Sequence, residues 1–158
     1  YLYMRHVPHK EETYGDTEEI IGNWFQKTKK RDKIILATKV AGPARNYLRG
    51  GQNSFVGKNL DDALEASLKR LKTDYIDIYQ IHRLRMNTPL EETLGALTDL
   101  QSQGKIRYAR STTNTSWKIT EASMLADYKG LIRIVSEQLP YNLLDRRVEN
   151  EILPAANV

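Results

Sequence analysis

Apolar residues along the 158-residue chain form short continuous runs that alternate with longer segments of helical spacing. The runs have strand length, are rich in Ile, Val and Tyr, and are bounded by charged or turn-forming residues. They predict strands over KIILATKV (33–40), YIDIYQIH (75–82), IRYARS (106–111) and RIVSEQ (133–138). The first residues, YLYM, have the composition of the end of a further strand.

The segments between the runs predict helices. Residues 59–74 place leucines on one helical face at Leu60, Leu64, Leu68 and Leu71. The segment 16–32 begins with a capping-box-like pair, Asp16 and Glu19. It continues with one apolar face, formed by Ile20, Ile21, Trp24 and Phe25. The segment 88–105 has the signals of a complete helix, with Thr88 as N-cap, Pro89 in the first turn, Glu91 completing a capping box and Gly104 as the stop. Further helices are expected over 116–128 and around 146–156.

Strands that alternate with helices predict an α/β fold of parallel strands joined by right-handed crossovers, with the sheet buried. Two architectures have this pattern, an open doubly wound sheet and an eight-stranded (β/α) barrel. An open nucleotide-binding sheet is expected to carry a glycine-rich turn between strand and helix. The chain contains neither a G-x-G-x-x-G motif nor a P-loop, which favours the barrel.

Composition excludes several classes of function. The chain has no cysteine, so disulfides, thiolate metal sites and cysteine nucleophiles are excluded, and no metal site is predicted. Its net charge of +4 is spread among acidic residues without a basic stripe, so nucleic acid is not an expected partner. No apolar run is long enough for a membrane span and no signal peptide is evident, so a cytoplasmic protein is expected.

Chemistry-bearing residues follow the predicted strands where each one ends. In a (β/α) barrel the functional groups gather at this rim, so Lys39 and His82 are expected to converge on one pocket, with Thr112, Thr113 and Gln138 on the same edge. A simpler interpretation remains for each residue alone, since a lysine there often only reaches water and a histidine often caps the strand. The glycine-rich loop 41–58, with Arg45 and Arg49, is either a lid over this rim or an ordinary surface loop.

Four segments in order, KIILATKV, SLKRLKTDYIDIYQIHR, TPLEETLGALTDLQSQGKIRY and EQLPYNLLDRR, resemble the aldo-keto reductase superfamily, in particular its bacterial-type members. The resemblance implies a (β/α)8 TIM barrel, of which residues 1–158 form one partial domain covering roughly strands 2 to 6. It also implies an NAD(P)H-dependent oxidoreductase that reduces aldehydes or ketones to alcohols. The implied cofactor is NADPH, less often NADH, and the implied partner is a small carbonyl substrate.

The resemblance also assigns roles to individual residues. Lys39 matches the catalytic lysine that lowers the pKa of a tyrosine, and His82 matches the histidine that orients the substrate carbonyl. Gln138 matches the glutamine that binds the nicotinamide carboxamide. The family's Ser-Asn pair, which contacts the same carboxamide, falls on Thr112 and Thr113 by ungapped counting, whereas a one-residue deletion places Asn114 there.

The chain departs from the family pattern at the proton donor. Arg5 stands where the catalytic tyrosine belongs, the catalytic aspartate would precede residue 1, and neither Tyr3 nor His6 falls on a matched position. Arg110 stands where the family favours a small residue. A chain of these residues alone is therefore expected to be a fragment that exposes part of a core and reduces aldehydes poorly.

Two alternatives stay open. The first is a catalytically impaired family member, a nucleotide-binding or regulatory protein. The second is an open α/β binding domain. The sequence sets neither the substrate nor the oligomeric state.

Overall fold

The computed structural model describes residues 13–40, 57–81 and 88–156. Its sheet contains β1 (Ala37–Val40), β2 (Ile76–Ile81), β3 (Ile106–Thr112) and β4 (Ile134–Gln138). The strands are all parallel and lie in the order β1-β2-β3-β4, so each is hydrogen-bonded to the next one along the chain. The predicted strand order and direction are confirmed.

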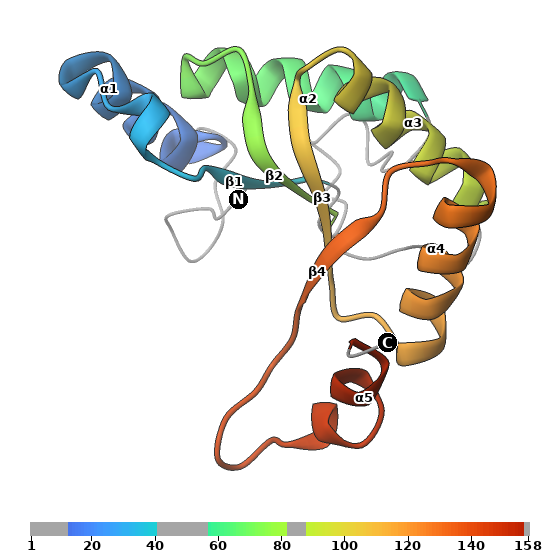
Figure 1. Ribbon diagram of the computed structural model, residues 1–158. Coiled ribbons are helices and arrows are strands. Elements are labelled where there is room, and N and C mark those ends of the chain that lie inside the picture. Colours follow the sequence, from blue (N-terminus) through green and yellow to red (C-terminus); the bar gives the residue numbers. More distant parts are fainter. Residues whose placement is uncertain (1–12, 41–56, 82–87, 157–158) are drawn as a thin grey trace.

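The four longer helices lie along one side of the sheet, and a fifth, short helix lies beyond the end of β4, against the fourth helix (Figure 1). They are α1 (Asp16–Thr28), α2 (Gly57–Leu71), α3 (Leu90–Ser102), α4 (Ser116–Lys129) and the short α5 (Ile152–Ala156). Two single-turn 3₁₀ helices, η2 (Arg31–Lys33) and η4 (Arg147–Glu149), precede β1 and α5. This arrangement of consecutive strand and helix units is the one predicted from the alternating patterns.

The core lies between the helices and the sheet. The leucine face predicted for α2 is buried, as Leu60, Leu64, Leu68 and Leu71 are each at most 7% exposed. These side chains join those of Tyr79 in β2 and Leu94 in α3 in one apolar cluster. The sheet is not buried throughout, however, since Tyr108 and Val135 are 54% and 55% exposed. The expectation of a fully buried sheet is therefore wrong for these residues.

The first strand is shorter than predicted. It begins at Ala37 because the 3₁₀ turn η2 occupies the start of the apolar run, and Ile35 is 78% exposed. The continuous apolar run therefore indicated a strand correctly but overestimated its length.

Both predicted capping boxes are wrong. Helix α1 begins directly at Asp16, with Gly15 at φ 91° as its N-cap and no side-chain cap. Its acidic first turn still favours the helix through the positive end of the helix dipole. Helix α3 likewise begins after Pro89 without a side-chain cap, although Gly104 at φ 74° ends that segment as predicted.

The inner face of α1 also differs from the prediction. Phe25 is buried, but Ile20 and Trp24 are 54% and 42% exposed. The inner face instead contains Gly22, whose Cα approaches the end of α2 so closely that a Cβ there would lie 2.2 Å from the backbone oxygen of Arg70. A small residue, rather than an apolar one, allows the contact between these two helices.

Candidate active site

The carboxyl ends of the four strands lie at one edge of the sheet. Lys39 is the next-to-last residue of β1, Thr112 is the last of β3 and Gln138 is the last of β4. Strand β2 ends at Ile81, so His82 follows it directly in the chain but lies outside the described residues. Other predicted features also lie outside them: Tyr3, Arg5, His6 and the loop arginines Arg45 and Arg49.

Lys39 lies on the face of the sheet that is turned away from α1. Its neighbour Thr38 is buried and donates a 2.5 Å hydrogen bond from Oγ1 to Glu18 of α1. Because successive side chains of a strand point to opposite faces, Lys39 points to the other side. We refer to this side, opposite the helices, as the concave face.

A buried ion pair fixes the strand that carries Lys39. Glu18 is 2% exposed and accepts from Arg70 of α2 at 2.6 Å, in addition to its bond with Thr38. One carboxylate therefore joins α1, α2 and β1. This arrangement holds the backbone of β1, and with it the position of Lys39, at the sheet edge.

Three polar residues form one row across the concave face. The strand register pairs Lys39 with Gln80 of β2, and Gln80 with Arg110 of β3. Partial burial lowers the pKa of Lys39, and the positive charge of Arg110 lowers that pKa further. An ammonium group held there can stabilise negative charge on a ligand oxygen. We refer to Lys39, Gln80 and Arg110 as the polar row.

Gln80 also contacts the fourth strand. It is 3% exposed, and its Nε2 donates a 3.0 Å hydrogen bond to Oε1 of Gln138. This bond uses the carbonyl of the Gln138 amide, which leaves the Nε2 group of Gln138 as a donor for a ligand. Gln80 was not predicted as a site residue, although a polar residue inside an apolar strand was the available signal.

The segment after β3 is held by Glu137. This carboxylate accepts a short hydrogen bond from Oγ of Ser111 and a 2.9 Å bond from the backbone N–H of Asn114. A register shift between β3 and β4 accompanies these contacts. Glu137 was not predicted as a site residue, and its signal is only its place beside Gln138.

These contacts separate the three residues predicted to bind the carboxamide. Asn114 is 8% exposed, and its side-chain amide donates to the backbone oxygen of Thr112 at 3.3 Å, so its side chain serves the turn. Thr112 pairs in register with Gln138, and the backbone N–H of Thr113 donates a 3.1 Å hydrogen bond to the backbone oxygen of Gln138. Thr113 is exposed, with φ 56°. The ungapped pair, Thr112 and Thr113, is therefore the one that lies beside Gln138.

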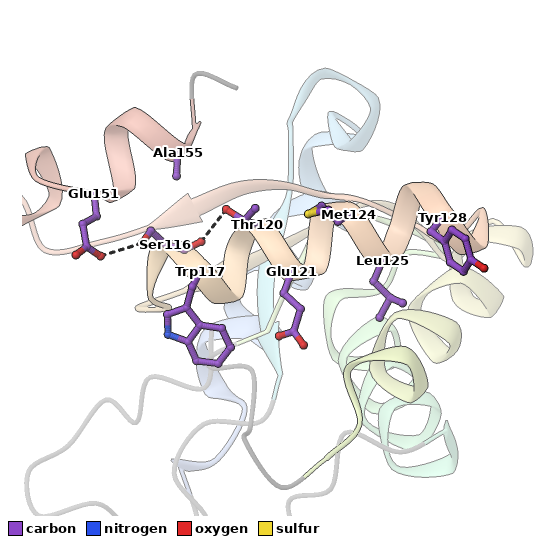
Figure 2. Close-up of a pocket in the computed structure, with 9 residues that line it drawn as sticks. All are labelled: Ser116, Trp117, Thr120, Glu121, Met124, Leu125, Tyr128, Glu151 and Ala155. Atoms are coloured by element: carbon purple, nitrogen blue, oxygen red, sulfur yellow. Dashed lines mark hydrogen bonds between the residues drawn. The ribbon is translucent and has the colours of Figure 1, made fainter.

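A separate groove of about 830 Å³ runs along α4 (Figure 2). Trp117, Met124, Leu125 and Tyr128 give it a mostly apolar wall, and α5 contributes Ala155. At one end, Oγ of Ser116 donates a 2.9 Å hydrogen bond to Glu151, which ties the start of α4 to the segment before α5. Because none of its lining residues belongs to the strand ends, the groove is not the candidate catalytic site.

The described residues contain neither a metal-binding cluster nor a membrane-spanning helix. Within residues 13–40, 57–81 and 88–156, no group of three or more His, Asp or Glu residues is placed to hold a metal ion. No helix in this part of the chain has the length and apolar character that crossing a membrane requires.

Comparison with known proteins identifies relatives over almost the whole chain. The Aldo/keto reductase family profile matches residues 12–157. Protein tas of Escherichia coli (strain K12) is 40% identical over 165 residues, which cover 92% of this chain and 48% of that protein. Aldo-keto reductase YhdN of Bacillus subtilis (strain 168) is 36% identical, covering 90% of this chain and 41% of that protein.

A fungal relative has a substrate in its name. Norsolorinic acid reductase B of Aspergillus parasiticus is 32% identical, covering 89% of this chain and 38% of that protein. The chain thus spans less than half the length of each of these three relatives.

Proposed function

Because the chain belongs to the aldo-keto reductase family, whose fold is a (β/α)8 barrel, we propose that it is part of an NAD(P)H-dependent oxidoreductase that reduces aldehydes or ketones to alcohols. The observation that carries the proposal is the position of Lys39 on the concave face at the carboxyl end of β1, beside Gln80 and near Arg110. In a barrel of this kind the chemistry lies at that rim.

Each candidate residue has a role that its chemistry permits. Reduction of a carbonyl places negative charge on its oxygen, and Lys39 stabilises that charge. His82 orients the carbonyl, a role that rests on the family resemblance. The bound cofactor supplies the hydride.

The donor set at the end of β4 fits a nicotinamide carboxamide. The Nε2 group of Gln138 donates to the carboxamide oxygen, and Thr112 and Thr113, which lie beside Gln138, offer hydroxyl groups to the same ligand. Gln80 holds the Gln138 amide through the 3.0 Å hydrogen bond and so fixes which of its atoms faces the ligand. We propose NADPH as the cofactor, with NADH as the alternative, and the cytoplasm as the location.

A second candidate is a family member that binds the nucleotide without reducing a substrate. Arg5 at the position of the family's tyrosine favours it, because a general acid typically contributes about 10²- to 10⁴-fold in rate. Under this second candidate, Lys39 and Gln138 retain their binding roles and turnover is lost.

The experiment that tests the proposal measures NADPH-dependent reduction of 4-nitrobenzaldehyde by the native protein that contains these residues. The readout is the loss of absorbance of the reduced nicotinamide. We expect turnover that falls about 10²-fold or more in Lys39→Met, since one charge-stabilising group is lost. Lys69→Met, which removes an exposed lysine of α2, is the matched control and retains activity.

Direct NADPH binding separates the two candidates. Binding without turnover in the parent protein supports the nucleotide-binding candidate and contradicts the reductase. Turnover that survives Lys39→Met contradicts the assignment of Lys39.

A further inference from the structure

Arg110 is the least expected member of the polar row. It lies in the middle of β3, opposite Gln80 of β2, on the concave face that also carries Lys39. Its Nε atom is buried and, within the part of the chain that the structure describes, has no hydrogen-bond partner. A buried guanidinium N–H without a partner is energetically costly, and such groups are usually paired with an anion or an acceptor.

The carboxylate on the neighbouring strand does not neutralise Arg110. Glu137 pairs in register with Ser111, the residue that follows Arg110 in β3. The side chains of Ser111 and Glu137 therefore point to the face of the sheet opposite that of Arg110. Both oxygens of Glu137 accept hydrogen bonds from Ser111 and Asn114. The other acid within the four described strands, Asp77, pairs with Arg31 near the opposite end of β2.

The polar row therefore brings two cations to one face with a neutral amide between them. Neighbouring strands lie about 4.8 Å apart, so the backbones of Lys39 and Arg110 are separated by about 10 Å, and long side chains from both can reach one small molecule. A guanidinium binds a carboxylate through two parallel hydrogen bonds, which makes Arg110 suited to a planar anion.

We propose that Arg110 binds the carboxylate of the substrate, and that the substrates of this site are 2-oxo acids, in which a carboxylate is joined directly to the reacting ketone. This rests on the proposed function, because Lys39 must then stabilise the ketone oxygen. Reduction transfers a hydride from the reduced cofactor to the ketone carbon and a proton from water to its oxygen, which gives a 2-hydroxy acid and the oxidised cofactor. Lys39 and Arg110 lie on the same face two strands apart, and both side chains are long enough to contact the two adjacent groups of such a compound.

A matched pair of substrates tests the charge alone. Benzoylformate carries the carboxylate, whereas methyl benzoylformate carries a neutral ester beside the same ketone. We expect the ratio of kcat/KM for the acid to that for the ester to fall about 10- to 100-fold in Arg110→Gln, the size expected for one charged hydrogen-bonded contact. Arg107→Gln removes a charge from the same strand, where the side chain is 58% exposed, and leaves the ratio unchanged.

Binding without turnover separates this proposal from the reductase function. Titration of benzoylformate into the protein with oxidised NADP⁺ allows no reduction, and calorimetry gives the dissociation constant. We expect this constant to rise about 10- to 100-fold in Arg110→Gln and not in Arg107→Gln. If the constant rises in this way in a protein that shows no turnover, the reductase function is refuted and the anion site at Arg110 is supported.

Three outcomes overturn the proposal. In the first, the parent protein does not bind benzoylformate. In the second, Arg110→Gln and the parent bind benzoylformate equally well. In the third, Arg110→Gln binds NADPH more weakly while its binding of benzoylformate is unchanged. The last result assigns the anion to a phosphate of the cofactor. Arg110→Lys keeps the charge without the paired donors, and an intermediate dissociation constant supports a two-bond contact.

Discussion

Gln80 and Gln138 are joined by a 3.0 Å hydrogen bond although the strands that carry them are separated by β3. Strands two apart in a sheet lie about 10 Å from one another, so this contact requires two long side chains that lean toward each other across β3. The bond also links the polar row on β1 to β3 with the proposed cofactor-binding end of β4.

Replacing Gln80 with leucine is expected to weaken NADPH binding. The change removes the hydrogen bond that orients the Gln138 amide, and one such bond contributes about 1 kcal/mol, so the dissociation constant should rise about 3- to 10-fold. Titration followed by NADPH fluorescence measures it. Gln103→Leu, at the exposed end of α3, is the control. An unchanged constant in Gln80→Leu would show that Gln138 needs no orientation or does not contact the cofactor.

Replacing Thr113 with asparagine is expected to raise stability. Thr113 adopts φ 56°, a left-handed conformation that disfavours β-branched residues and that asparagine tolerates better. Its side chain is exposed, so little packing is lost. We expect a gain of about 0.5–1 kcal/mol in the free energy of unfolding. Urea titration measures the gain, and Thr113→Val, which keeps the branch, should give none.

The fold could be predicted from the sequence because its main determinants are local. Leu60, Leu64, Leu68 and Leu71 repeat at helical spacing, and all are buried in α2. The strands are short and apolar, and their alternation with helices leaves few topologies. The capping residues could not be predicted in the same way, since Gly15 caps α1 through its backbone conformation and without a side-chain hydrogen bond.

The site could be predicted only in part, because its contacts depend on register between distant strands. The rule that strand ends share an edge identified Lys39, Thr112 and Gln138. The sequence does not show that Gln80 lies opposite Lys39 or that it reaches Gln138, which is 58 positions away. Arg110 was recognised as an unusual charge, but its row with Lys39 follows from the register of β1, β2 and β3.

Asp77 is expected to make stability fall in acid. Burial alone would raise the pKa of this carboxyl, but the backbone N–H of Leu36 and the side chain of Arg31, together with the charge of Arg107, hold the pKa below its ordinary value of 3.8. The folded pKa is the lower one, so the stabilisation is present above about pH 4 and is lost as the pH falls through the folded pKa.

The variant Asp77→Asn tests this pH dependence. At pH 7 it should be less stable than the parent by about 1–3 kcal/mol, because charged hydrogen bonds are lost. The difference should narrow as the pH falls below about 4, where the parent carboxyl protonates. Urea unfolding over a pH series measures both. Asp99→Asn, an exposed site in α3, is the control, and a difference that stays constant with pH in Asp77→Asn would contradict the electrostatic explanation.

Replacing two helical glycines with alanine is expected to change the free energy of unfolding in opposite directions. A Cβ at Gly22 of α1 would lie 2.2 Å from the backbone oxygen of Arg70 and 2.8 Å from the backbone carbon of Leu71, so the two helices must separate. A Cβ at Gly95 of α3 has no heavy atom within 4 Å. Overpacking costs about 1–3 kcal/mol, whereas alanine in a helix interior gains about 0.5–1 kcal/mol over glycine.

The pair of variants separates close packing from backbone entropy. We expect Gly22→Ala to lower the free energy of unfolding and Gly95→Ala to raise it, measured by urea titration under identical conditions. Because α1 also carries Glu18, which bonds to Thr38 beside Lys39, displacement of α1 in Gly22→Ala should lower turnover as well. Equal stabilisation by both variants would show that α1 does not pack against the end of α2 as closely as the structure places it.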